Sequence, residues 1–226
     1  MSLSAASLTS YATVYFQNSG TISGWTTANP QQKGRIYQVT SPTWNGGTAL
    51  AFEQTWNNAL TGYHSEVIKA NAQSDGTERY YGKVIRLPSN WIWHDKNDTH
   101  TQFSPENPEG PWRLVWIQNN HLWTQSVSGN KDLGAISSNT WIRIVYRLKL
   151  NSSTGAYEVW INGTKKLSQV NINQVIPGNT LRWSNGIYCT NWRTTPPPPG
   201  DATQRTIYQD HFRITSSYNE ANPSSW

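Results

Sequence analysis

Residues 157–167 contain two strand-like segments joined by a tight turn: Tyr157-Glu158-Val159-Trp160-Ile161, then Asn162-Gly163, then Thr164-Lys165-Lys166-Leu167. The first segment is rich in aromatic and β-branched residues, which favour β-strands. An Asn-Gly pair is typical of a type I′ turn, because both central residues of that turn need a positive φ. The stretch therefore predicts a β-hairpin.

Similar strand-like segments recur along the chain, whereas no segment shows sustained 3.6-residue apolar periodicity, so we expect little helix. Further strands are expected at residues 13–17, 35–40, 48–54, 63–69, 78–86, 100–103, 112–118, 121–127, 141–150, 181–190 and 206–215. Turn signals between strands are Asn45-Gly46-Gly47, Asp75-Gly76, Asn119-Asn120 and Thr154-Gly155. This spacing predicts a single all-β domain over residues 1–226, a β-sandwich or jelly roll with a concave groove on one sheet.

The composition excludes several classes of protein. Charged residues make up only 14% of the chain and aromatic residues 12%, which argues against disorder. No apolar run reaches the ~18 residues that a membrane-spanning helix needs, so we expect no membrane partner. The net charge of +5 favours an acidic partner, but the basic residues are scattered, which argues against nucleic acid. The single cysteine, Cys189, cannot form an internal disulfide.

Two expected strands each place a pair of polar side chains on one face. His64 and Glu66 alternate on the first strand, and His100 and Gln102 alternate on the second, with Phe103 directed to the core. Glutamine is depleted in strands, so Gln102 hints at a functional role. Such faces could line a groove, or they could be the solvated face of an edge strand or a strand end.

A third strand carries Arg182, Ser184, Gly186, Tyr188 and Trp192 on one side if its alternation continues to its end. A tyrosine next to a glycine, with an arginine on the same face, suits the floor of a groove. The alternative is a packed tyrosine whose hydroxyl is hydrogen-bonded within the fold.

Thirteen tryptophans are more than a core of this size usually needs. An aromatic ring matches the apolar face of a sugar ring, so we expect at least two tryptophans to face a ligand. The candidates are Trp91, Trp93, Trp112, Trp116, Trp123 and Trp192.

Taken in order, several short motifs resemble those of jelly-roll polysaccharide lyases of the concanavalin A-like sandwich type. The chain is most similar to the fungal-type glucuronan lyases of polysaccharide lyase family 20, and the resemblance covers nearly the whole chain. The motifs are Tyr63-His64-Ser65-Glu66-Val67, Glu78-Arg79-Tyr80-Tyr81-Gly82, Thr101-Gln102-Phe103, Gly186-Ile187-Tyr188, Tyr208-Gln209-Asp210-His211-Phe212 and the ending Asn219-Glu220-Ala221-Asn222-Pro223-Ser224-Ser225-Trp226.

The alginate lyases of family 7 are a more distant resemblance. In that family the glutamine motif continues to a histidine two residues later, where this chain has Ser104. The first strand also has His64 where an arginine is usual. Both departures argue against a family 7 activity.

The resemblance implies β-elimination on a polymer of uronic acids. Gln102, with help from Arg182, would neutralise the substrate carboxylate so that the C5 proton can leave. In a 4-linked β-D-glucuronan, H5 and O4 lie on the same face of the ring, so the elimination is syn and one residue could serve as both base and acid. Tyr188 is the candidate acid, and it could serve in both roles. His64 is the alternative base, or a neighbour that tunes Tyr188.

The resemblance also implies further site residues and partners. Glu66, His100, Arg182, Trp116 and Trp192 are expected to bind an anionic polysaccharide. The relatives often carry a structural calcium, and Asp210 matches an aspartate that contributes to it, although Asp210 could equally be a turn or capping residue. No organic cofactor is expected.

We expect a secreted, monomeric enzyme. The first residues, Met1-Ser2-Leu3-Ser4, lack the basic start and apolar run of a signal peptide.

Two other functions remain open on the sequence. One is a lyase for another uronan, such as polymannuronate, whose cleavage is also a syn elimination. The other is a non-catalytic carbohydrate-binding sandwich, which would need the aromatic residues but not the convergence of His64, Gln102 and Tyr188. A glycosidase is a weaker option, because it would need two carboxylates in the cleft.

Overall fold

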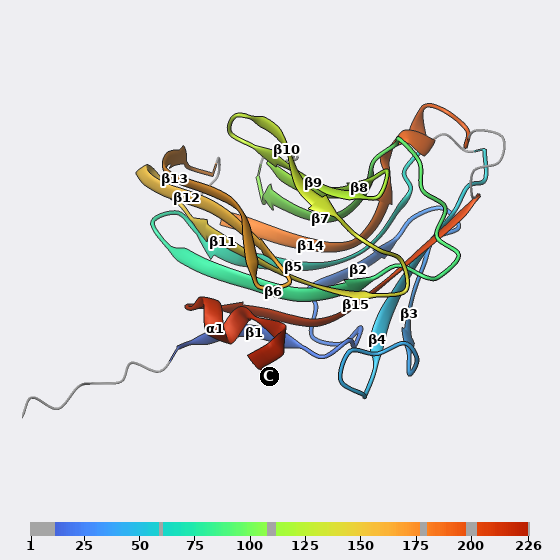
Figure 1. The fold of residues 1–226 in the computed structure, drawn as a ribbon, viewed down its shortest axis with the longest axis horizontal. Coiled ribbons are helices and arrows are strands. Elements are labelled where there is room, and N and C mark those ends of the chain that lie inside the picture. The colour runs from blue at the N-terminus through green and yellow to red at the C-terminus, as the bar shows by residue number, and fades with distance from the viewer. Residues whose placement is uncertain (1–11, 59–60, 108–111, 177–179, 198–202, 226) are drawn as a thin grey trace, which may run out of the picture.

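The structure is a computed structural model that describes residues 12–58, 61–107, 112–176, 180–197 and 203–225. Its strands form two antiparallel sheets that lie one above the other, and both sheets are curved (Figure 1). This arrangement confirms the expected all-β jelly-roll sandwich. No helix in the described part of the chain is long and apolar enough to span a membrane.

The first sheet, called the outer sheet here, has the strand order β13-β12-β11-β6-β15-β4-β3, and β1 also pairs with β15. Its strands are β1 (Val14–Asn18), β3 (Arg35–Val39), β4 (Ala49–Thr55), β6 (Glu78–Arg86), β11 (Trp141–Lys149), β12 (Asn151–Ile161), β13 (Thr164–Gln174) and β15 (Gln204–Thr215).

The second sheet, called the groove sheet, has the order β10-β9-β8-β7-β14-β5-β2. Its strands are β2 (Thr27–Pro30), β5 (His64–Ser74), β7 (Asp98–Pro105), β8 (Arg113–Gln118), β9 (His121–Ser126), β10 (Gly129–Ala135) and β14 (Thr180–Cys189). The described helical segments are all short: η1 (Thr190–Arg193), α1 (Tyr218–Ala221) and η2 (Pro223–Ser225).

The expected strands are all present, although β5, β7, β12, β13 and β15 extend further than predicted. Asn162 and Gly163 have φ values of 51° and 86°, as the predicted turn requires. Thr154-Gly155 is not a turn, because it lies inside β12 at an irregularity in its pairing with β13. The sequence pattern does not predict β2 and β10. Both are edge strands, which are covered on fewer sides and need not alternate strictly.

Aromatic side chains from both sheets fill the space between them. Trp183 of β14 is fully buried, and its ring lies 5.2 Å from Tyr81, 6.4 Å from Phe103 and 6.1 Å from Phe212 between ring centroids. Tyr81 and Phe212 belong to the outer sheet, whereas Phe103 and Trp183 belong to the groove sheet. This packing gives the groove sheet a rigid support from below.

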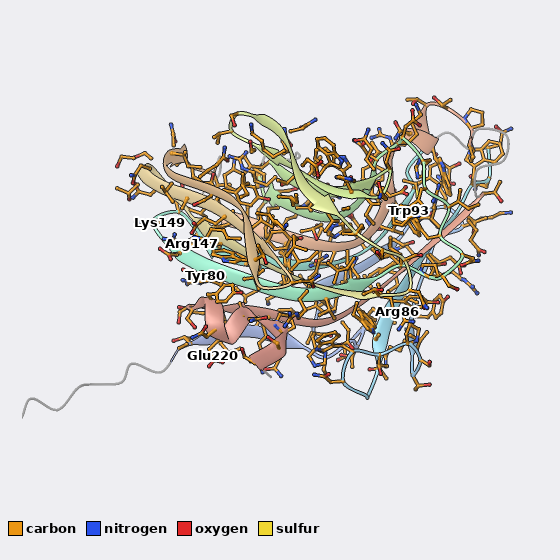
Figure 2. All side chains as sticks on the ribbon, in the orientation of Figure 1. Tyr80, Arg86, Trp93, Arg147, Lys149 and Glu220 are labelled. Carbon is orange, nitrogen blue, oxygen red and sulfur yellow. The ribbon has the colours of Figure 1, made fainter. Side chains whose placement is uncertain are left out.

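The opposite face of the outer sheet carries a charged network. Arg147 donates to Glu78 at 2.8 Å and to Glu158 at 2.6 Å, and its guanidinium lies 6.0 Å from the Tyr80 ring centroid. Figure 2 shows Tyr80 and Arg147 together on β6 and β11. These groups lie on the outer sheet, so they stabilise the sandwich away from the groove.

His100 lies in the interior and is 1% exposed, so the prediction that it binds a ligand beside Gln102 is wrong. The physical reason is an irregularity in the pairing of β7 with β8 between Thr99 and Thr101, where simple alternation does not hold. The His100 imidazole instead shares a hydrogen bond with Thr101 at 3.1 Å.

The burial of His100 predicts a loss of stability on acidification. Burial, assisted by the nearby Lys83 ammonium, holds the pKa of His100 well below its ordinary value of 6.5. Below pH ~6.5 the unfolded chain therefore binds a proton that the folded chain does not, and each such proton lowers stability by about 1.4 kcal/mol per pH unit. Urea unfolding between pH 7 and pH 5 should show a shallower loss in His100→Gln than in wild type. Equal slopes would contradict this account.

A second prediction concerns Gly82 of β6, where α1 packs against the outer sheet. A Cβ atom at Gly82 would lie only 1.7 Å from the Ala221 carbonyl oxygen. Gly82→Ala should therefore force the C-terminal segment away from the sheet and lower the unfolding free energy by about 1–3 kcal/mol. Removing residues 217–226 in the same variant should abolish most of the difference, because the clash then disappears. An unchanged denaturation midpoint in Gly82→Ala would show that α1 does not pack as described.

Candidate active site

A groove lies over the face of the groove sheet that is turned away from the core. Its central part has a volume of about 430 Å³ and draws on β2, β5, β7 and β14, with a lining that includes Asn29, His64, Glu66, Gln102, Arg182 and Ser184. A second hollow of about 510 Å³ continues it, because Gln31 and His64 line both. His64 therefore lies where the two parts of the groove meet.

Tyr188 and His64 form a stacked pair at this junction. They are register partners on β14 and β5, with ring centroids 3.5 Å apart and ring planes inclined by 28°. Gly186, two residues before Tyr188, allows the strands to come this close, because a Cβ atom there would lie 1.9 Å from the Ser65 carbonyl oxygen. The glycine next to the tyrosine is thus required by the close contact of the two strands.

Glu66 holds two of the other site residues. One carboxylate oxygen lies 2.9 Å from His64 Nδ1, and the other accepts a hydrogen bond from Gln102 Nε2 at 2.5 Å. Glu66 is 4% exposed, so these bonds form in a shielded setting and are strong. Because a carboxylate accepts hydrogen bonds, Nδ1 of His64 donates in this contact, and Nε2 is the ring nitrogen that remains as a candidate proton acceptor.

Arg193 is a site residue that the sequence pattern does not reveal. Its Nη1 donates to the Tyr188 hydroxyl at 2.7 Å, and the residue also lines the second hollow. Arg193 lies on η1, directly after β14, so strand alternation carries no information about its direction. The only signal in the sequence is a cation five residues after the tyrosine.

Strand alternation correctly predicts the position of five site residues. His64, Glu66, Gln102 and Arg182 line the groove, and Tyr188 is stacked on His64. Their chemical roles remain predictions. What the structure adds is that four of the five, with Arg193, form one connected set of contacts.

Two tryptophans expected to bind a ligand are buried instead. Trp192 is 4% exposed, because β14 ends at Cys189 and the chain turns into η1, which packs the Trp192 ring edge-on against Tyr63 at 5.4 Å. Trp116 is 3% exposed, and its indole N–H donates to Gln118 at 3.1 Å. The structure therefore does not present either ring for stacking on a sugar, contrary to the expected substrate contacts of Trp116 and Trp192.

Asp210, the expected calcium ligand, is fully buried in β15. Its carboxylate accepts hydrogen bonds from the backbone N–H groups of Trp44 at 3.1 Å and His211 at 2.7 Å. The described residues contain no group of three or more His, Cys, Asp or Glu side chains that could hold a metal ion. The side chains around Asp210 therefore do not by themselves make a calcium site, and the metal stays a prediction that would depend on backbone oxygens.

Comparison with solved structures shows which fold the chain shares. An endo-β-1,4-glucuronan lyase from the fungus Trichoderma reesei has 24% identity and a TM-score of 0.84 over 95% of this chain and 100% of that chain. The cellulose-induced protein Cip1 has 15% identity and a TM-score of 0.57 over 84% and 88% of the two chains. The alginate lyase Aly36B has 15% identity and a TM-score of 0.55 over 90% and 93%.

No curated protein matches the sequence. The family model described as polysaccharide lyase, however, matches residues 17–213, which include every groove residue described above. The fold, the groove and this match lead to the same conclusion. The chain belongs to the polysaccharide lyase family and is a lyase.

Proposed function

We propose that the enzyme cleaves a 4-linked polymer of uronic acids, in the first place β-1,4-glucuronan, by syn β-elimination. The observation that carries the proposal is the connected set of Arg193, Tyr188, His64, Glu66 and Gln102. His64, Glu66 and Gln102 line the central groove, and Arg193 lines the second hollow. Glucuronan is chosen because the chain is similar over 95% of its length to a glucuronan lyase.

The first requirement of the reaction is to stabilise the negative charge that develops when H5 leaves. Gln102 and Arg182 both line the central groove, and in this proposal they bind the substrate carboxylate. Gln102 uses one N–H on Glu66, and a primary amide has a second N–H for the substrate. Donors fixed in place before the reaction stabilise such charge without reorganising.

The second requirement is a group that removes H5 and protonates O4 on the same face of the sugar. In this proposal Tyr188 does both. In its phenolate form it would take H5, and the Arg193 guanidinium, which donates a hydrogen bond to the same oxygen, is the group that would stabilise the negative charge there. The proton gained from C5 then passes to O4 as the C4–O4 bond breaks. His64, which keeps Nε2 free, is the alternative base.

A non-catalytic carbohydrate-binding module is the second candidate, and the structure weakens it. Such a module depends on exposed aromatic rings; Trp116 and Trp192 are buried, and Trp93, Trp112 and Trp123 are only partly exposed. Stacking of sugars on aromatic rings does not require the hydrogen-bonded cluster of His64, Glu66 and Gln102. The convergence of base, acid and carboxylate-binding groups favours turnover.

The remaining expectations follow from the proposed substrate. An enzyme meets a polysaccharide outside the cell, so we propose that the protein is secreted. We also propose that it acts as a monomer. A structural calcium near Asp210 would raise the melting temperature when calcium is returned to EGTA-treated protein.

The substrate is tested by the ultraviolet absorbance of unsaturated uronides, with glucuronan, polymannuronate and polyguluronate assayed in parallel. We expect a rise with glucuronan and none with polyguluronate, whose H5 and O4 lie on opposite faces. A rise with polymannuronate alone would keep the mechanism and change the substrate. Binding without any product would favour the carbohydrate-binding module.

The catalytic assignment is tested by Tyr188→Phe, which keeps the ring stacked on His64 but removes the hydroxyl. We expect kcat to fall about 10²–10⁴-fold, the range of general acid–base catalysis, while polymer binding is retained. His64→Gln should have the smaller effect. If His64→Gln abolishes turnover and Tyr188→Phe does not, His64 is the base.

The contact between Arg193 and Tyr188 predicts that substitutions at these two residues have non-additive effects on kcat. Arg193→Ala should lower kcat about 10–100-fold, in line with the loss of a hydrogen bond to a charged group. In the Tyr188→Phe background the same change should have little further effect on kcat, because the oxygen it contacts is gone. Equal effects in both backgrounds would mean that Arg193 acts on the substrate rather than on Tyr188.

A further inference from the structure

Lys83 of β6 is fully buried between the two sheets, beneath the groove. Its Nζ donates to the His100 carbonyl oxygen at 2.9 Å, to Asn185 Oδ1 at 2.8 Å and to Gln209 Oε1 at 2.8 Å. Three acceptors use three N–H groups, which only the ammonium form provides. The three acceptors therefore favour the charged form of Lys83, which burial disfavours.

All three acceptors of Lys83 are neutral. In the part of the chain that the structure describes, no carboxylate forms an ion pair with it. Burial holds the pKa of Lys83 well below its ordinary value of 10.5, and the negative charge of Glu66 acts against this shift. A buried cation without a compensating charge is costly, so Glu66 is the charge that makes Lys83 tolerable.

The groups bound by Lys83 belong to the strands that carry the active site. His100 lies two residues before Gln102 on β7, and Asn185 lies three residues before Tyr188 on β14. Gln209, the third acceptor, also donates to the Gly186 carbonyl oxygen at 2.7 Å. Gly186 is the register partner of Glu66. Lys83 thus ties the outer sheet to the backbone directly under the site.

Glu66 is a buried negative charge and, like Lys83, it needs an opposite charge nearby. It is a shielded carboxylate on the floor of a groove that, in the proposed function, receives a polyanion. An uncompensated negative charge there would repel the substrate. The Lys83 ammonium on the other side of the sheet supplies the opposite charge without occupying the groove.

We propose that Lys83 is a positioning residue of the active site, which holds β7 and β14 in place from below and balances the charge of Glu66 so that the groove accepts an anionic polymer. The inference rests on the proposed function, because it assumes that the substrate is a polyuronate. It assigns Lys83 no direct contact with substrate.

The charge balance is tested by a double-mutant cycle with Lys83→Met and Glu66→Gln. The readout is the binding of glucuronan by calorimetry in the Tyr188→Phe background, where turnover does not interfere. Lys83→Met alone should weaken binding about 10-fold, and in the Glu66→Gln background it should weaken binding less than about 3-fold. Additive effects would overturn the electrostatic role of Lys83.

Lys149→Met is the matched control, because it removes one positive charge from the chain far from η1, whose Arg193 lines the second hollow of the groove. Figure 2 shows Lys149 at the opposite end of the molecule from that turn. We expect unchanged binding. An equal loss in both lysine variants would mean that only the net charge of the protein matters, and the proposal would fail.

Asn185→Asp keeps the test decisive if Lys83→Met does not fold. The Asn185 Nδ2 group has no hydrogen-bond partner among the described residues, so the change loses no bond and keeps the acceptor for Lys83. The new carboxylate would compensate Lys83 locally and leave Glu66 unbalanced. Thermal stability should be kept while binding weakens about 10-fold, and less so in the Glu66→Gln background. Unchanged binding would overturn the proposal.

Failure of this inference and failure of the proposed function give different results. Suppose that the wild-type protein binds glucuronan but yields no unsaturated product, while the effects of Lys83→Met and Glu66→Gln on binding are coupled. This result would refute the lyase mechanism and leave Lys83 as the balancing charge. If the wild-type protein yields unsaturated product but the effects of Lys83→Met and Glu66→Gln on binding are additive, the lyase mechanism stands and the role of Lys83 is refuted. Wild type that binds none of the three uronans would refute both.

Discussion

The pairing of β14 with β5 is the constraint on which the active site depends. A side chain at position 186 would collide with the Ser65 carbonyl oxygen. Because Gly186 has none, the two strands can approach until Tyr188 stacks on His64. The same register places Glu66 opposite Gly186, next to both partners that it binds. Trp183, on the other face of β14, anchors the strand in the aromatic core. Core packing and catalytic geometry are thus set by one strand.

Charge is arranged in layers around this strand. Arg182 and Arg193 line the groove, Glu66 lies in its floor, and Lys83 lies beneath. Glu66 and Lys83 are each held by at least two hydrogen bonds, which limits the cost of burying their charges. The net charge of +5 is therefore a poor guide to the site, where the sign of the charge alternates with depth.

Strand alternation in the sequence predicts most of the fold and part of the site, because a strand repeats every two residues wherever its pairing is regular. It succeeds for His64 and Gln102, which lie in regular parts of their strands. It fails for His100 at a pairing irregularity and for Trp192 beyond the end of β14. Arg193 is missed because its position depends on a turn. These features depend on contacts between distant segments, which no local pattern records.

Glu66 uses one carboxylate to hold both His64 and Gln102. Any replacement at one of these three positions therefore changes the environment of the other two, and their effects on fitness will be strongly epistatic. A laboratory evolution experiment that aims at a new uronan would make poor progress by varying them one at a time. Ser184 lines the same groove, and none of the hydrogen bonds described joins it to Glu66, so it is the better starting position for changing specificity.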